Sequence, residues 1–470
     1  MHRQLLLAGS FVEGATVAPV HAPFDGRVLN SVAQASREQV QTAIEFATAG
    51  RARLKTLSAG QRRSVLDGIV RGLIARRDEF IDCIVHEAGK PLSAARAEVS
   101  RAIETFTLAS AELSRFGGEL VPVDLTPGSE GTEAEVRRVP VGVVVGIVPF
   151  NFPLNLGAHK VAPALAVGAP IIVKPPPQAP SAMLLLGEVA LAAGADAAAL
   201  QVLPCAVDVA ESLATDARVR VVSFTGSAKV GWQLKAKVKG RAVLELGGNA
   251  AAIVRHDADV KKAAKRLALG GFTYAGQVCI KVQRIIVEAA GWDAFVPAFL
   301  AEVDTLKVGD PSSESTVVGP VIDSASATRI EAWVDEAVAM GAKVLRRGAR
   351  VGAVLPPIVL TDVPREARAF SEEIFGPVVV LERVAGFDEA LSSVNASRYG
   401  LQAALFTNEL SAVRRAFQEL EVGGLIVNDS TAFRSDNMPY GGVKDSGLGR
   451  EGVRYAMNDF TEERVLVLRP

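Results

Sequence analysis

The sequence predicts an α/β protein in which two successive units are each built on a mainly parallel, doubly wound sheet. From Gly142 onward, short apolar runs recur, and segments with helical spacing separate several of them. Buried parallel strands have this near-continuous Val, Ile and Leu composition. The length of 470 residues is about three domains' worth, which leaves room for more than one core. The predicted strands are GVVVGIV, IIVK, LQVL, VRVVSF and AVLEL in the first unit, and AAIV, RIIVE, AKVL, VVVLERV and GLIVN in the second.

The part of the chain before Gly142 is predicted to be largely helical. Apolar residues between Ser36 and Leu57 recur at helical spacing. Ser58 suits an N-cap because Gln61 follows three residues later, as in a capping box. We expect the helix that begins there to end at Gly89-Lys90-Pro91. Further helices are expected at about Ser93 to Phe116, Ser181 to Ala193, Ala228 to Lys237 and Ser324 to Met340.

Two segments differ from this pattern. Residues 124–139 are polar and turn-rich and then alternate, which indicates a hairpin projecting from the body. The C-terminal run ERVLVL predicts one more strand, and an isolated strand needs a partner. Either the hairpin or another subunit could supply that partner.

Charge and hydropathy exclude several classes of function. With 51 Lys and Arg against 52 Asp and Glu, the net charge of −1 gives no general attraction for nucleic acid or anionic lipid. The stretch 139–173 carries one charge, Lys160, and could span a bilayer by length. Its five prolines, together with Asn151 and Asn155, favour buried strands with turns instead. We therefore expect neither a nucleic-acid nor a membrane partner.

The three cysteines, Cys83, Cys205 and Cys279, are too few and too scattered for a disulfide framework. This usage fits a reducing, cytoplasmic setting, and the N-terminal apolar run is too short for a signal peptide. No CxxC or Cys/His cluster stands where it could hold a metal, so none is expected. Cys83 lies on an apolar helical face and is interpreted as a packing residue.

Three residues could carry covalent chemistry. Cys279 in GQVCI could act as a thiolate nucleophile, although an isolated cysteine is more often structural. Asn151 in PFNFP follows a predicted parallel strand, where its amide could donate to a developing oxyanion or simply shape a turn. Glu245 ends the strand AVLEL before two glycines, so its carboxylate could act as a general base or cap the next turn.

Other residues suggest anion and sugar recognition. In SFTGSAKVG, Gly226 turns the chain and Ser227 opens a helix, whose free backbone N–H groups would favour a pyrophosphate. Lys174 ends the strand IIVK and could reach a ribose hydroxyl or a phosphate, or extend into solvent. Glu373 in EEIFGPV offers another acid beside a turn. Each of these signals is weak alone.

Together and in this order, the motifs PFNFP, FTGS, LELGG, GQVC, EEIFGP and MPYGGVKDSGLGRE resemble those of the aldehyde dehydrogenase superfamily over nearly the whole chain. The resemblance implies that Cys279 is the nucleophile, forming a thiohemiacetal and then a thioester. Asn151 and the backbone N–H of Cys279 would hold the oxyanion, and Glu245 would activate water to release the acid. Lys160 would be a supporting residue near Asn151.

The resemblance also implies a cofactor, NAD or NADP. Lys174 and Glu373 would contact ribose, Phe375 the nicotinamide, and Gly226 and Ser227 the pyrophosphate. Pro177 stands where NAD-preferring members often have glutamate, so both cofactors stay open. Cys205 and Val207 replace glycines of a family turn on the adenine side. The full cofactor-binding set expected is Pro149, Phe150, Lys174, Gly226, Ser227, Gly231, Glu373 and Phe375.

Three basic residues, Arg115, His159 and Arg434, are expected near the substrate channel. Together they favour a short anionic aldehyde, as in phosphonoacetaldehyde, sulfoacetaldehyde, glyceraldehyde 3-phosphate or lactaldehyde dehydrogenases. Each could instead be a surface cation or a satisfied core histidine. Glu245 speaks against a coenzyme A-acylating semialdehyde dehydrogenase, the first alternative, and the complete set of Cys279, Glu245 and Asn151 speaks against a non-catalytic binding protein, the second.

The resemblance finally implies a division of the chain. A cofactor-binding domain would comprise residues 1–122 and 141–246, and a catalytic domain residues 247–445. Residues 123–140 and 446–470 would form a small β element for assembly into a homodimer or homotetramer.

Overall fold

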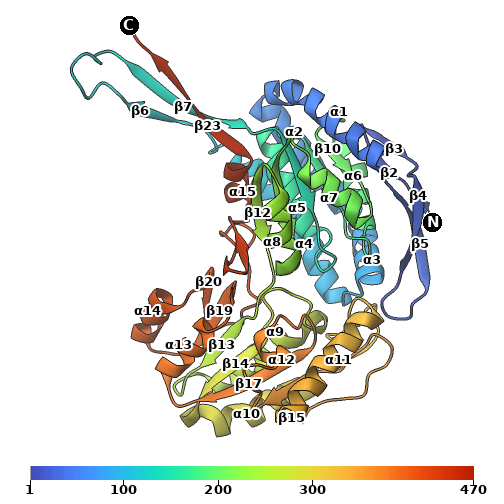
Figure 1. Ribbon diagram of the computed structural model, residues 1–470, viewed down its shortest axis with the longest axis vertical. Helices are drawn as coiled ribbons and strands as arrows, with labels where there is room; N and C mark the ends of the chain where they lie inside the picture. The colour runs from blue at the N-terminus through green and yellow to red at the C-terminus, as the bar shows by residue number, and fades with distance from the viewer. Residues whose placement is uncertain (1) are drawn as a thin grey trace.

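The computed structural model describes residues 2–470, and two large sheets organise them (Figure 1). The first sheet has the strand order β22-β12-β11-β8-β9-β10-β2-β3. Its five central strands are parallel, whereas β22 and the β2–β3 pair are antiparallel at the edges. The strands are β2 (Leu5–Leu7), β3 (Ser10–Val12), β8 (Val143–Ile147), β9 (Ile171–Lys174), β10 (Leu200–Val202), β11 (Val219–Thr225), β12 (Arg241–Glu245) and β22 (Gly447–Leu448).

The second sheet has the order β15-β16-β17-β14-β13-β19-β20 and is parallel except for β15 at one edge. The α/β class with two parallel sheets is therefore confirmed. The strands are β13 (Ala251–Val254), β14 (Arg284–Glu288), β15 (Lys343–Arg346), β16 (Ile358–Thr361), β17 (Val378–Val384), β19 (Gln402–Phe406) and β20 (Gly424–Val427).

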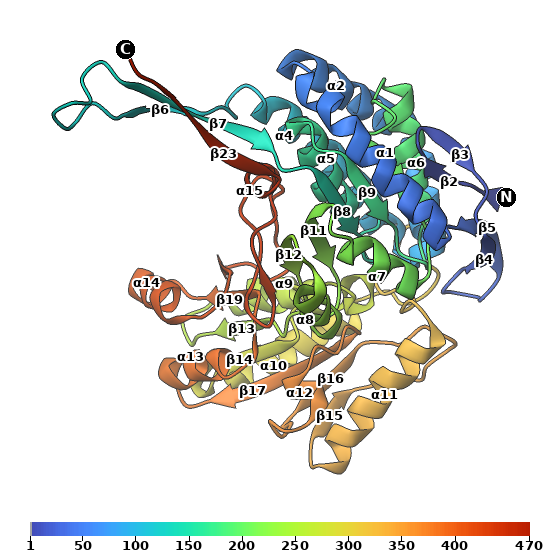
Figure 2. The same cartoon turned by 45° about the horizontal axis from the view of Figure 1, so that its top comes forward.

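Helices cover both sheets (Figures 1 and 2). Around the first sheet lie α1 (Arg37–Thr56), α2 (Ala59–Ala75), α3 (Arg77–Ala88), α4 (Leu92–Glu112), α5 (Asn155–Val167), α6 (Ser181–Ala192), α7 (Val207–Thr215), α8 (Ala228–Lys237) and α15 (Val453–Asp459). Around the second lie α9 (Val260–Phe272), η1 (Thr273–Gly276), α10 (Ala289–Asp304), α11 (Ser324–Ala339), α12 (Arg368–Ser371), α13 (Phe387–Asn395) and α14 (Leu410–Glu419).

The expected capping box at Ser58 and Gln61 is present, but the single helix predicted from there to Gly89 is wrong. The chain leaves helical geometry at Arg76, with φ −107° and ψ 20°, which separates α2 from α3. There the Arg76 guanidinium binds both Glu79 and Glu188. Because the helical spacing of apolar residues continues across Arg76, the sequence pattern does not indicate the break between the two helices. Gly89 ends α3 in the left-handed conformation, with φ 64°.

The stretch 139–173 forms β8, α5 and β9, so a buried helix lies between the two expected strands. In the described part of the chain, no helix is long and apolar enough to cross a membrane. The sequence also failed to predict a small sheet near the N-terminus, with order β1-β5-β4. Its strands are β1 (His2–Arg3), β4 (Thr16–His21) and β5 (Val28–Gln34). A two-stranded sheet pairs β18 (Tyr399–Gly400) with β21 (Val443–Lys444).

A three-stranded arm projects from the body and ends near the C-terminus (Figure 1). In it, β23 (Thr461–Leu468) pairs antiparallel with β7 (Glu133–Pro140) over its whole length, and β7 pairs with β6 (Glu119–Pro122). The hairpin of the same chain is therefore a partner of the terminal strand. Several apolar side chains of the arm are exposed, among them Leu120, Val465 and Leu468.

Candidate active site

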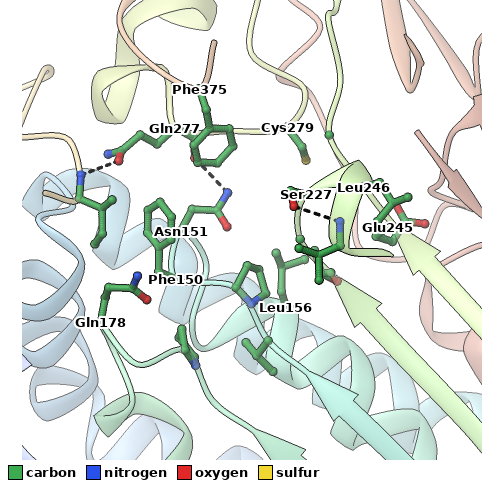
Figure 3. Close-up of a pocket in the computed structure, with 18 of the residues that line it drawn as sticks. Phe150, Asn151, Leu156, Gln178, Ser227, Glu245, Leu246, Gln277, Cys279 and Phe375 are labelled. Carbon is green, nitrogen blue, oxygen red and sulfur yellow. Dashed lines mark hydrogen bonds between the residues drawn. The ribbon is translucent and has the colours of Figure 1, made fainter. Parts of the chain in front are cut away.

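A cavity of about 580 Å³ lies where the two sheets approach each other (Figure 3). The carboxyl ends of β8, β11 and β12 supply one wall, as expected for ligand sites in doubly wound sheets. Loops of the second unit supply the other wall, including Cys279 and Phe375. The predicted residues that line the cavity are Pro149, Phe150, Asn151, Lys174, Gly226, Ser227, Glu245, Cys279, Glu373 and Phe375.

A tight turn after α9 positions Cys279. Tyr274, Ala275 and Gly276 have φ of 56°, 52° and 67°, three successive left-handed residues of which two are not glycine. Such residues cost about 1–3 kcal/mol each and persist where the surroundings hold them. Here the Tyr274 hydroxyl donates to the Ala88 carbonyl at 2.9 Å, and the Ile322 amide donates to the Gln277 side chain at 2.8 Å. Burial raises the pKa of the Cys279 thiol to about 12, so the sulfur rests as a thiol.

The amide of Asn151 points toward the same turn (Figure 3). Its Nδ2 donates to the Gln277 carbonyl at 2.9 Å, which ties the end of β8 to the loop that carries Cys279. An amide nitrogen has two hydrogens, so one donor is left for an oxygen near the sulfur. The residue is buried, which strengthens any hydrogen bond that this donor makes.

Glu245 ends β12 as a buried acid, and neither of its carboxylate oxygens has a hydrogen-bond partner among residues 2–470. Burial, and then the nearby Glu451 carboxylate, raise the pKa of Glu245 well above its usual value. A Cβ on Gly441 would stand 2.7 Å from Glu245 Oε1, so a glycine there keeps room beside the carboxylate. A proton acceptor with a raised pKa and no fixed partner suits a general base.

Lys160 lies behind the cavity rather than in it. Its Nζ donates to Glu451 at 2.9 Å, to Thr225 Oγ1 at 2.7 Å and to Ser223 Oγ at 3.2 Å. Although burial opposes it, Lys160 and Arg434 hold the pKa of Glu451 down at about 2. Lys160 therefore positions β11 and fixes the charge of the carboxylate next to Glu245.

The cavity wall offers groups that suit a dinucleotide. Ser227 caps α8, accepting from the Val230 amide at 3.5 Å, so the first turn presents free N–H groups to the cavity. Glu373 accepts from the Gly248 amide at 3.1 Å, and burial raises its pKa to about 7. A Cβ on Gly247 would stand 2.1 Å from Glu373 Oε2, so only glycine leaves that carboxylate in place. These donors and acceptors, with Lys174 on the opposite wall, fit ribose and pyrophosphate.

Two rings frame one part of this wall. Phe150 and Phe375 meet edge to face, with centroids 5.9 Å apart and planes at 83° (Figure 3). Gly231, by contrast, does not line the cavity. A Cβ there would stand 2.3 Å from Leu246 Cδ2, so this glycine lets α8 pack closely on Leu246, which does line it.

The three basic residues expected near the substrate occupy different places. Arg115 is 69% exposed at the end of α4, is paired with Glu112, and does not line the cavity. His159 is fully buried, with Nε2 2.8 Å from Asp436, which also receives two hydrogen bonds from Arg101. Arg434 is 6% exposed and binds Glu451 at 3.1 Å. His159 and Arg434 lie near one another, but neither lines the cavity, so the structure places none of the three predicted substrate residues in its wall.

Comparison with known proteins decides the family. The model of the aldehyde dehydrogenase family matches residues 11–466. The chain belongs to this family. It is 44% identical to a 3-sulfolactaldehyde dehydrogenase of Priestia aryabhattai, over 93% of this chain and 92% of that protein.

Solved structures agree with this assignment. Aldehyde dehydrogenase 21 of Physcomitrella patens, solved with the reaction product succinate, is 42% identical, with a TM-score of 0.96 and coverage of 100% of this chain and 98% of that one. The glyceraldehyde-3-phosphate dehydrogenase GapN of Methanocaldococcus jannaschii, solved with NADP, is 37% identical, with a TM-score of 0.93 and coverage of 96% and 99%. The protein is an NAD(P)-dependent aldehyde dehydrogenase that oxidises an aldehyde to a carboxylate through a cysteine thioester.

The structure adds residues to this aldehyde dehydrogenase site to which the motifs gave no role, although Val230 and Tyr440 stand within two of those motifs. Arg329 of α11 lines the cavity and donates to the Ile374 carbonyl at 2.9 Å, beside Glu373. Gln178 and Val230 line it as well. Tyr440 reaches the sulfur of Cys279 from a loop 161 residues away. An arginine on an amphipathic helix and a tyrosine in a loop carry no local sign of such a position; only the fold supplies it.

Proposed function

We propose that this aldehyde dehydrogenase acts on short aldehydes whose far end carries an anionic group, and that Arg434 recognises that group. The observation that carries the proposal is the environment of Arg434. Its side chain is buried behind the cavity wall, over the ring of Tyr440, whose hydroxyl contacts Cys279. Its Nε has no hydrogen-bond partner in the described chain. A buried donor without a partner costs about 1–3 kcal/mol, which an anionic oxygen of a substrate would offset.

The arrangement of the loop supports the same substrate class. Asp436, two residues after Arg434, is held by Arg101 at 2.6 Å and by His159 at 2.8 Å. These contacts fix the loop that carries Arg434 against α4 and α5. His159 would then act through Asp436 rather than by touching substrate. The similar proteins named for 3-sulfolactaldehyde, for glyceraldehyde 3-phosphate and for a complex with succinate handle anionic molecules of this size.

We propose the following residue roles, which the geometry supports. Cys279 loses its proton and attacks the aldehyde carbon, while the free N–H of Asn151 and the Cys279 amide stabilise the oxyanion. The bound nicotinamide cofactor supplies the hydride acceptor. Glu245 takes a proton from the water that attacks the thioester, and Cys279 leaves as a thiolate. Lys160 keeps Glu451 ionised, so that Glu245 is the acid of the pair that takes up the proton.

We further propose that the exposed arm mediates assembly into a homodimer or homotetramer. A long strand edge with exposed Val465 and Leu468 is a surface that a second copy would cover. We also propose a cytoplasmic location, because the unpaired thiol of Cys279 needs a reducing compartment.

One assay tests the substrate class and both alternatives. NADH or NADPH formation is followed without coenzyme A, using matched aldehydes that end in sulfonate, phosphate, carboxylate or a neutral hydroxyl. We expect kcat/KM to be at least tenfold higher for an anionic tail, and Arg434→Gln to remove most of that preference. Equal rates for charged and neutral tails in the wild type would refute the proposal. Turnover only with coenzyme A would favour the acylating alternative, and a folded enzyme inert toward every aldehyde would favour a binding protein.

A further inference from the structure

The side of Cys279 away from the cofactor wall is covered by a tyrosine. The Tyr440 hydroxyl lies 3.0 Å from Cys279 Sγ, and the tyrosine is 3% exposed. Among residues 2–470, no other hydrogen-bond partner of this hydroxyl is found. The Tyr440 hydroxyl is therefore available to hydrogen-bond with Cys279 Sγ.

The backbone holds this tyrosine firmly. The Tyr440 amide donates to the Glu451 carbonyl at 3.0 Å, and the Glu451 amide donates back at 2.6 Å. Gly441, the next residue, packs against the Glu245 carboxylate. Tyr440 is thus fixed in a loop that also contacts the general base, and its ring has little freedom to move away from Cys279.

A cation lies over the same ring. The Arg434 guanidinium stands 3.8 Å from the Tyr440 ring centroid, within the range of a strong cation–π contact. Arg434 is held there by Glu451 at 3.1 Å. A positive charge over the ring withdraws electron density from the phenol, which makes its O–H a better hydrogen-bond donor.

Because both groups are buried, the proton arrangement is determined. Burial raises the pKa of the Cys279 thiol to about 12 and that of the Tyr440 phenol well above its usual value. The charged groups that face the sulfur are Glu373 and Glu245, which oppose the thiolate, and Arg434, which favours it. When Cys279 ionises, Tyr440 keeps its proton, and its O–H stands 3.0 Å from the new negative charge.

We propose that Tyr440 is a catalytic residue that donates its phenolic O–H to the Cys279 thiolate, and that Arg434 strengthens this donor through the ring. The hydrogen bond stabilises the thiolate inside a site that otherwise disfavours it, and aims the sulfur at the incoming carbonyl carbon. This inference rests on Cys279 being the nucleophile, as in the proposed function.

The test measures thiolate formation directly. The rate of alkylation by iodoacetamide is followed against pH, and modification of Cys279 is quantified by mass spectrometry. In this reaction the thiolate sulfur bonds to the reagent's methylene carbon, iodide leaves, and the thiol proton goes to the buffer. In Tyr440→Phe, we expect alkylation to be about tenfold slower across the neutral pH range, far below the pKa of about 12 of the Cys279 thiol, since a hydrogen bond to a charged group is lost and this pKa rises by about one unit. Superimposed profiles, or faster alkylation, would overturn the proposal.

Tyr455→Phe is the matched control, because it removes the hydroxyl of a tyrosine that is 36% exposed. Its profile should superimpose on the wild type. Thermal unfolding checks that both variants fold; should Tyr440→Phe not fold, Tyr440→Met provides the second variant and should shift the profile in the same direction.

A double-mutant cycle tests the part assigned to Arg434. Arg434→Gln should slow alkylation less in the Tyr440→Phe background than in the wild type, and equal slowing in both backgrounds would refute action through the ring. Failure of the proposed function looks different. If Cys279 is alkylated without loss of aldehyde oxidation, Cys279 is not the nucleophile; if alkylation abolishes activity while the Tyr440→Phe profile is unchanged, only the inference fails.

Discussion

On one side of Cys279 the protein leaves a cavity of about 580 Å³, whereas on the other it packs charged side chains with almost no exposed surface. The open side is lined by two phenylalanines and by separate polar groups that come from strand ends, loops and α11. The closed side is a chain of contacts from Lys160 through Glu451 and Arg434 to Tyr440.

The difference indicates that the open side binds the cofactor and the closed side places charges near the reacting groups. A dinucleotide is large and can be held by many weak contacts, so the open side needs shape more than charge. The closed side must place single charges near Cys279 and Glu245, and buried charges act strongly only when their partners are fixed. Substitutions on the closed side should therefore alter chemistry and stability. On the open side, apart from Cys279 and Glu245, they should mainly alter cofactor choice.

The largest effect is expected at Glu245. In Glu245→Gln, thioester hydrolysis loses its base, so steady-state turnover should fall about 10²- to 10⁴-fold while the first turnover still releases a burst of reduced cofactor. Because the pKa of Glu245 is raised and the base must be deprotonated, wild-type hydrolysis should accelerate with rising pH through a value above the usual range for glutamate. The variant should lose this limb. Stopped-flow absorbance measures both phases; a missing burst with intact cofactor binding would contradict the assignment.

The next effect concerns stability. In Lys160→Met, the buried Glu451 carboxylate loses its 2.9 Å partner and keeps Arg434 at 3.1 Å. Removing one member of a buried ion pair costs about 3–5 kcal/mol when the other charge is left unpaired, so with Arg434 still present the loss should be at the lower end of this range, and the urea midpoint should fall. Lys237→Met is the matched control, since its 2.8 Å pair with Glu211 is about half exposed and should contribute little. Equal falls of the urea midpoint in the two variants would mean that the buried pair of Lys160 and Glu451 stabilises the fold no more than the exposed pair of Lys237 and Glu211.

The sequence predicts much of both sides, for different reasons. Asn151 and Glu245 stand in motifs at the ends of predicted strands, and Cys279 stands in the motif GQVC, so the motifs alone singled out all three. The roles of Tyr440, which stands in a quoted motif, and of Arg329 could not be found this way, because they depend on contacts between distant segments. Gly231 belonged to the right motif but serves helix packing, a distinction that depends on its distance to Leu246. At the break between α2 and α3, Arg76 pairs with Glu188, more than a hundred residues away, a contact that the local pattern cannot indicate.

A smaller effect is expected on the open side. Pro177 lines the cavity near Lys174, and no carboxylate stands at this position to repel a 2′-phosphate. Pro177→Glu should lower kcat/KM with NADP about tenfold relative to NAD. The new carboxylate would repel the 2′-phosphate of NADP by about 1.4 kcal/mol. Pro177→Gln, of the same shape without the charge, should leave the ratio near the wild-type value. If both variants change the ratio equally, the backbone of the loop and not its charge selects the cofactor.

The smallest effect is expected at Arg115, which belongs to neither side. Its side chain is 69% exposed and paired with Glu112. To bind Arg115, a substrate anion would have to displace the Glu112 carboxylate in a solvent-exposed position, where ion pairs contribute little. Arg115→Ala should therefore change kcat/KM for an anionic aldehyde less than about twofold, as for most surface substitutions. The same substrate series measured with Arg434→Gln should show a larger loss. The buried Arg434 has a donor without a partner, whereas the exposed Arg115 can bind water. A tenfold loss in Arg115→Ala that is confined to anionic tails would extend the substrate site to the end of α4, and anion recognition would then no longer belong to the closed side alone.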